Sequence, residues 1–272
     1  MSAVTTFLRN RPGLGLGLLI LVVILGASTF APLPYDPVAT DVSSTLKSPS
    51  WEHVFGTDRS GFDVFSRTIR AARVDLSLAV VGTLLSMVIG VPLGLLASTK
   101  NRWSDRLMRG LDTFQAFPLL VLAIAIVSLT GNNLKNVVVA IGLINTPRFM
   151  RLVRADALAV RESRYVEAAI SLGASPARVL RRHVLPNVSG IVLVQATLTA
   201  ANAIVVIAAL SFVGIGVTPP TPSWGSMIRS GTQNIASGSW WISIFPGLAV
   251  VLAVWALNKI ADGVQAGIGR SR

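Results

Sequence analysis

Long uncharged stretches are the feature of this sequence that most limits its fold. The longest runs for 46 residues, from His183 to Ile228, without a Lys, Arg, Asp or Glu. Four more are 22 to 29 residues long and span 12–35, 76–99, 113–134 and 230–258. Each can hold a helix of about 20 residues, which crosses a hydrocarbon core roughly 30 Å thick. Because lipid cannot satisfy open backbone groups, we expect an all-α polytopic membrane protein.

Composition excludes the common soluble classes. Hydrophobic residues make up 52% of the 272 residues and charged residues 13%, against about 25% charged in a typical soluble domain. A net charge of +12 would suggest nucleic acid in a soluble protein. No basic stretch is rich in aromatic residues, however, so no nucleic-acid partner is expected. Cysteine is absent and the two histidines are far apart, which argues against a metal site.

Positive charge indicates how many times the chain crosses the membrane. Residues 136–147 form a shorter apolar stretch, which spans only if it continues through Arg148, Arg151 and Arg154. The alternative is a short re-entrant piece. If this stretch crosses the membrane, the chain has six membrane spans and both termini are cytoplasmic. In that arrangement 17 of the 24 Lys and Arg residues lie on the cytoplasmic side. Without the span the bias reverses, so the positive-inside rule favours about six spans.

The chain divides into two regions. Residues 1–75 are expected to hold a membrane helix and an extracytoplasmic segment, and the apolar run is too long for an ordinary signal peptide. Ser60 followed by Asp63 has the form of a capping box. Apolar residues then recur at helical spacing, which predicts an amphipathic helix on the outer membrane surface; the alternative is a solvated connector. Residues 76–272 are expected to form a core of five membrane helices.

The polar loop at about 148–187 has helix start and stop signals. Good helix formers precede Gly173, which suits a left-handed residue after a helix end. Ser175 can cap a second helix and Pro176 suits its first position, and we expect that helix to end near Pro186. A solvated loop, the alternative, does not need such punctuation. The pattern therefore favours a folded helix–turn–helix that docks a cytoplasmic partner.

The same loop has a recognisable pattern of residues. It consists of Glu167, Ala168, Ala169, Gly173, Leu185 and Pro186. Their order and spacing resemble the EAA loop of ABC importer permeases. His183 stands where the family pattern has isoleucine.

Three further segments narrow the resemblance to one branch of these permeases. They are residues 55–67, 105–118 and 210–225. The first segment is similar to G-T-D-x-x-G-R-D-V-x-S-R, with Phe62 in place of the arginine. The second is similar to D-x-x-M-R-x-x-D…P, and the third to L-S-F-L-G-L-G-V…P-P-x-P-x-W-G. These patterns resemble the permeases of dipeptide, oligopeptide and nickel importers, and among them the C-type subunit.

The resemblance implies a type I ABC importer permease bundle in a bacterial or archaeal inner membrane. Such a permease forms half of a translocation pathway for peptides or a related small solute. The implied partners are a second permease, two cytoplasmic ATPase subunits, an extracytoplasmic substrate-binding protein and the lipid bilayer. ATP and Mg would belong to the ATPase subunits, so no cofactor is expected in this chain.

The resemblance also assigns site residues. Those expected to couple to the ATPase are Glu167, Ala168, Ala169, Gly173, Ala174, Ser175, Pro176, Leu185 and Pro186. Those expected at an outer gate or a binding-protein contact are Asp58, Arg67, Trp224 and Arg229. No residue is assigned a catalytic or metal-binding role.

The chain is not expected to be an enzyme. It contains no G-x-x-x-x-G-K-[ST] loop for phosphate and no G-x-S-x-G. The alternative function is an ion-gradient-driven secondary transporter or a channel. Such proteins place ionisable groups within the membrane, whereas the long apolar stretches here lack them.

Overall fold

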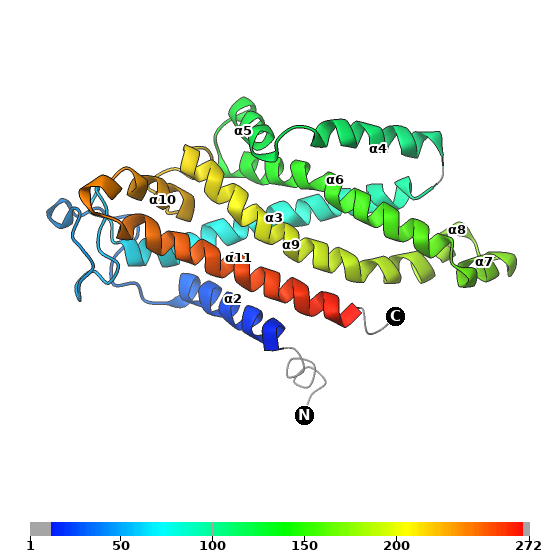
Figure 1. Ribbon diagram of the computed structural model, residues 1–272, viewed down its shortest axis with the longest axis horizontal. Helices are drawn as coiled ribbons and strands as arrows, with labels where there is room; N and C mark the ends of the chain where they lie inside the picture. Colours follow the sequence, from blue (N-terminus) through cyan, green and yellow to red (C-terminus); the bar gives the residue numbers. More distant parts are fainter. Residues whose placement is uncertain (1–11, 100, 269–272) are drawn as a thin grey trace.

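The computed structural model describes residues 12–99 and 101–268, and within them the fold is helical (Figure 1). The longer helices are α2 (Pro12–Phe30), α3 (Val64–Ala97), α4 (Arg102–Gln115), α5 (Leu119–Thr130), α6 (Leu134–Arg161), α9 (Leu185–Val213) and α11 (Trp241–Ile268). The shorter ones are η1 (Val42–Ser44), α7 (Arg164–Ser171), α8 (Pro176–Val179), η2 (Leu180–Val184), α10 (Trp224–Thr232) and η3 (Ile235–Ser237). Strand pairing in these residues is limited to one bridge, between Thr57 and Asp63. The all-α prediction is confirmed.

The long helices α2, α3, α6, α9 and α11 pack along one another (Figure 1). α3 packs on α6 and α9, and α11 packs on α9 and α2. Most buried apolar side chains form one cluster among these helices. α7 and α8 lie at one end of the bundle, and α10 lies at the other end with the segment that precedes α3 (Figure 1). We call residues 162–184 the elbow, and residues 31–63 with 214–240 the α10 end.

Among the described residues, four helices are long and apolar enough to cross a membrane: Pro12–Phe30, Val64–Ala97, Pro176–Val213 and Trp241–Gly267. The bent pair α4 and α5 allows a fifth crossing. The predicted span at 136–147 lies in α6, which continues without a break through the three arginines, as that prediction required. α6 has 28 residues and is therefore about 42 Å long. It is long enough to cross a membrane, but it is too polar to count among the four apolar helices.

The separate surface helix predicted before the second span is wrong. α3 is one helix from Val64 to Ala97, so the expected boundary at residue 75 falls inside it. Its cap is Asp63, whose side chain accepts the N–H of Ser66, and not Ser60. The first turns of α3 are buried on several sides because the segments before α3 and α10 pack over them.

Two further expectations need correction. The stretch at 113–134 is not one straight span, since the chain leaves the helix at 116–118 and α5 turns by 89° from α4. Pro186 does not end a helix, because it lies just after the π-helical segment and the chain continues through it as α9. The chain remains helical from Pro176 to Val213, with a π-helical segment at 180–184.

Glycines bring α3 and α6 into close contact. A Cβ at Gly90 would lie 2.7 Å from the carbonyl oxygen of Thr146 and from Cβ of Phe149. One at Gly94 would lie 2.7 Å from the carbonyl oxygen of Met150. Small residues at spacings of four allow this approach in membrane helices. Gly90 and Gly94 therefore have a packing role, because a larger side chain at either position would meet α6.

Replacing Gly94 by leucine is expected to destabilise the bundle by roughly 1–3 kcal/mol, because the side chain meets backbone on α6 that cannot move aside. Thermal unfolding in detergent measures the effect. The matched control is Gly26→Leu in α2, where a Cβ meets nothing within 4 Å. Equal melting temperatures for the two variants would contradict the close α3–α6 contact.

Candidate functional site

The elbow turns the chain sharply between α6 and α9. After α7 the N–H of Gly173 donates to the carbonyl of Ile170 at 2.9 Å, and the N–H of Ala174 donates to that of Ala169 at 3.0 Å. With Gly173 at a φ of +83°, this is a Schellman motif. Ser175 then accepts the N–H of Arg178 and begins α8. The predicted helix–turn–helix and its Gly173 stop are confirmed.

A small apolar core fixes the elbow to the bundle. Its buried members are Val153, Ala157, Val160, Val166, Val179, Val184 and Val188. Val91 and Leu95, near the end of α3, pack against them. The elbow is therefore joined to α3, α6 and α9 through one packed cluster, so a displacement of α7 is transmitted to these helices.

Much of α7, together with the residue that follows it, Leu172, is exposed and partly apolar. Val166 points into the elbow core, whereas Leu172 is 89% exposed and Ile170 and Tyr165 are also exposed. Glu167 lies on the same exposed helix. An uncovered apolar patch of this kind on a folded element marks a contact surface.

A basic hollow adjoins this patch. It has a volume of about 470 Å³ and is lined by Ser175, Ala177, Arg178, Arg181 and Arg182. The patch and the hollow together combine apolar contacts with positive charge, which suits a groove with acidic groups at its rim.

The nine residues predicted to couple lie together at this end of the bundle. Ala169 and Ala174 are partly exposed, and the other seven are exposed. All nine belong to the elbow or to the first two residues of α9. Their grouping agrees with a single contact surface.

The aspartates of the 105–118 segment lie on the side of α4 that meets α6. Arg151 donates to Asp112 at 2.7 Å and Arg154 donates to Asp105 at 3.0 Å. Arg154 also donates to the carbonyl oxygen of Ala97 at the end of α3. These contacts fasten α4 across α3 and α6, although exposed pairs of this kind contribute little stability individually.

A cavity of about 500 Å³ lies at the break between α4 and α5. Phe114, Phe117, Pro118 and Leu119 line it from the break, and Ile144, Arg148 and Arg151 line it from α6. Backbone that leaves the helix at membrane depth is tolerated where it faces protein or a water-filled cavity. The cavity thus brings the open backbone of the break next to side chains of α6.

The four predicted outer residues do not form one exposed site. Trp224 is 1% exposed and Arg67 is 3% exposed, so neither side chain is open to a binding protein in this structure, and the expected role at an outer gate stays a prediction for both. Trp224 donates through its indole N–H to the carbonyl oxygen of Thr68. Arg67 donates to the carbonyl oxygen of Pro37 at 2.6 Å. Both side chains are occupied in packing the α10 end.

The other two predicted outer residues are more accessible. Asp58 accepts the N–H groups of Ser60 and Phe62 in a tight turn. Burial raises the pKa of the Asp58 carboxyl, against the lowering effect of these hydrogen bonds and of Arg67. Arg229 is exposed on α10 and lies against Gly214. Of the four, Arg229 is the one that presents its side chain at the surface.

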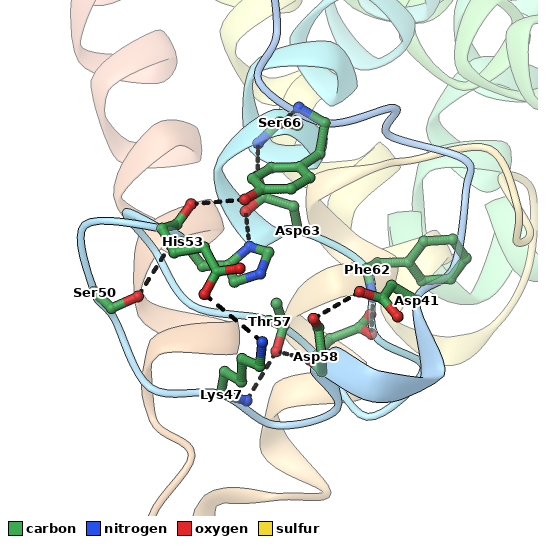
Figure 2. Close-up of polar contacts among 12 residues, drawn as sticks. Asp41, Lys47, Ser50, His53, Thr57, Asp58, Phe62, Asp63 and Ser66 are labelled. Carbon is green, nitrogen blue, oxygen red and sulfur yellow. Dashed lines mark hydrogen bonds and ion pairs between the residues drawn. The ribbon is translucent and has the colours of Figure 1, made fainter.

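A buried polar cluster at the start of α3 was not expected from the sequence (Figure 2). Asp63 accepts the N–H of Ser66 at 2.7 Å through Oδ2, and His53 Nδ1 donates to Oδ1 at 3.0 Å. Tyr35 stacks on the His53 ring with centroids 4.5 Å apart. The residues come from separate parts of the segment, so their meeting depends on its fold, and only the helix cap was visible as a local signal.

Asp75 was also missed. It follows Thr68, Ala71 and Ala72 on one face of α3 and is fully buried there. The uncharged stretch begins at the next residue, Leu76, so Asp75 was not part of the expected membrane span. The signal in the sequence is the helical spacing that puts Asp75 on the same face as the small residues Ala71 and Ala72.

These features define a class: a polytopic helical membrane protein with a folded, exposed elbow between two long helices. Residues 90–272 match the family described as binding-protein-dependent transport system inner membrane component. The chain belongs to this family and is a permease subunit of an ABC transporter.

Individual relatives extend the match over almost the whole chain. A candidate peptide transport system permease protein of Brucella suis biovar 1 (strain 1330) is 39% identical over 95% of this chain and 88% of its own. The dipeptide transport system permease protein DppC of Alkalihalophilus pseudofirmus is 39% identical over 92% of this chain and 83% of its own. The MetNI methionine ABC transporter, solved in inward-facing conformations, has a chain with a TM-score of 0.63 at 19% identity, covering 74% of this chain and 96% of that one; this likeness shows the fold.

Replacing Asp63 by alanine is expected to destabilise the protein by about 2 kcal/mol or more, because α3 loses its cap and buried His53 loses its partner. The melting temperature in detergent measures this. Asp36→Ala is the matched control, since exposed Asp36 accepts one local N–H, that of Val38. Similar melting temperatures for both variants would count against a structural role for the buried cluster.

Proposed function

We propose that this chain forms half of the translocation pathway of an ATP-driven peptide importer and couples to a separate ATPase through the elbow. The observation that carries the proposal is the exposed apolar face of α7, held by a core that also contacts α3, α6 and α9. A partner that grips this face can displace three membrane helices together. The ATPase would hold ATP and Mg, and this chain would bind neither.

The cargo is inferred from the relatives. Curated relatives at about 39% identity are named for peptide or dipeptide transport, which favours a peptide or a related small solute. A second permease would complete the pathway, and an extracytoplasmic binding protein would deliver the cargo. On this chain, exposed Arg229 at the α10 end is the best placed of the predicted outer residues to meet the binding protein.

The cavity at the α4–α5 break is our candidate for part of this pathway. It joins aromatic surface from Phe114 and Phe117 to the charged groups of Arg148 and Arg151. A peptide presents both apolar side chains and a carboxylate, so both kinds of surface have a complement in the cargo. The helix break provides the polar backbone that a continuous span hides.

We infer that the elbow faces the cytoplasm of a bacterial or archaeal cell. The region from Arg148 to Arg182 carries eight arginines, and positive-inside bias places such a region on the cytoplasmic side. Both termini would then be cytoplasmic as well; residues 1–11 and 269–272 lie outside the described residues. The α10 end would face the outside.

An ion-gradient-driven transporter is the competing function. Buried Asp75 is the feature that speaks for it, because acids within membrane helices often carry protons or bind ions. Its carboxylate, however, accepts the backbone N–H of Trp224 at 2.8 Å, which gives it a structural task. The exposed elbow has no evident use in such a transporter.

Leu172→Asp is expected to weaken ATPase binding at least about tenfold, a loss of about 1.4 kcal/mol, because a charge replaces an apolar contact. Co-purification of the ATPase and transport into proteoliposomes measure the effect. Val42→Asp is the matched control, since Val42 is 84% exposed at the opposite end. Normal ATPase capture by Leu172→Asp would remove α7 from the coupling surface.

Single cysteines test the orientation, because the native sequence has none. Val42→Cys is expected to react with a membrane-impermeant maleimide on intact spheroplasts, and Ser171→Cys, exposed on α7, only after permeabilisation. The reversed pattern would overturn the cytoplasmic assignment of the elbow.

A further inference from the structure

Asp75 is a buried acid with a specific partner in a distant part of the chain. It lies on α3 and is 1% exposed. Its Oδ2 accepts the backbone N–H of Trp224, the first residue of α10, at 2.8 Å. Its Oδ1 has no hydrogen-bond partner among the residues that the structure describes. The carboxylate thus depends on α10 for its one assigned hydrogen bond.

The contact has favourable electrostatics. The first N–H groups of a helix are unpaired within the helix and carry its partial positive charge. Ser223 satisfies the N–H of Ser226, and Asp75 satisfies that of Trp224. A carboxylate at a helix N-terminus is stabilised, most strongly where water is excluded. Asp75 therefore acts as a cap that comes from a different helix.

Two neighbouring contacts join the same parts of the chain. The indole N–H of Trp224 donates to the carbonyl oxygen of Thr68, on α3, at 2.9 Å. Arg67, also on α3, donates to the carbonyl oxygen of Pro220, just before α10, at 3.3 Å. Polar bonds from α3 thus hold both α10 and the segment that leads into it.

The rest of α10 is held by close backbone packing at two glycines. A Cβ at Gly225 would fall on the backbone of Ala208 in α9, and one at Gly231 would fall on Ser243 in α11. Such contacts fix how closely α10 lies on α9 and α11, but they carry little directional preference. The hydrogen bonds to α3 fix the position of the N-terminal end of α10.

Separating α10 from α3 would be costly at this point. A buried carboxylate without a hydrogen-bond donor is strongly unfavourable in an apolar environment. Removal of the Trp224 N–H would leave both oxygens of Asp75 without a partner. The contact therefore favours an arrangement in which α10 follows any movement of α3.

We propose that Asp75 is a positioning residue of the permease, which fixes α10 to α3 so that the two move as one body during transport. The reference to transport rests on the function proposed above. The geometric part, that Asp75 sets the position of α10, is independent of the elbow and of any ATPase.

The geometric part is tested by distance measurement on the full-length permease in nanodiscs. Spin labels at Ser77→Cys in α3 and Thr232→Cys in α10, both exposed positions, report the separation by double electron–electron resonance. Asp75→Leu is expected to broaden and shift the distance distribution. Asp75→Asn is expected to retain it, because the side-chain amide oxygen still accepts the N–H of Trp224.

Two further variants keep the result interpretable. Thr83→Val removes another buried polar group of α3, away from α10, and is expected to leave the distances unchanged. Asp75→Ala is measured beside the leucine variant, so that a folding failure of the larger side chain does not decide the outcome. An unchanged distribution in the folded Asp75 variants would overturn the proposal.

The role in transport is tested in the assembled transporter. Asp75→Leu, or Asp75→Ala where leucine is not tolerated, is expected to lower peptide uptake per ATP hydrolysed at least about tenfold, with normal ATPase co-purification and rescue by Asp75→Asn. Uptake at the native level would overturn the role of Asp75 in transport. Failure of the elbow proposal instead shows as intact ATPase capture by Leu172→Asp, so the two failures are distinguishable.

Discussion

The close contact between α3 and α6 is the interaction on which the rest of the structure depends. In lipid, helices gain nothing from hiding apolar surface, so association relies on close packing. Gly90 and Gly94 allow the backbones to approach. Helix α3 begins next to its cap, Asp63, at the α10 end and passes Asp75. Its last turns pack into the elbow core beside α6. One helix pair thus connects the elbow to the α10 end.

Features set by local chemistry could be predicted from the sequence. The apolar stretches predicted the membrane helices, because a backbone in lipid must satisfy its hydrogen bonds within the protein. Gly173 and Ser175 gave the turn of the elbow, because a left-handed residue and a cap act within a few residues. The grouping of the coupling residues followed from that turn. These parts required no knowledge of distant contacts.

Features that depend on distant partners could not be predicted in this way. Arg67 and Trp224 were expected at the surface of an outer segment. They are buried because the chain before α3 and the chain before α10 fold over each other. Asp63, and not the expected Ser60, caps α3, and its second carboxylate oxygen is bonded to His53, ten residues away. The break at 116–118 has a local signal in Pro118, which disfavours helix at the residue before it, but the 89° turn between α4 and α5 has no such signal.

The π-helical segment at 180–184 has a consequence for how this elbow tolerates change. A π turn contains one residue more than an α turn, and each residue of an α-helix advances the face by about 100°. Both turns complete about one revolution, so a one-residue deletion there would restore regular winding and leave α7 and α8 at nearly the same angle about the axis of α9. Loss of one residue at this joint would therefore leave Leu172 and Arg178 near their present orientation, whereas a deletion in the regular part of α9 would turn them by about 100°; the joint can absorb a change in chain length that the helix beside it cannot.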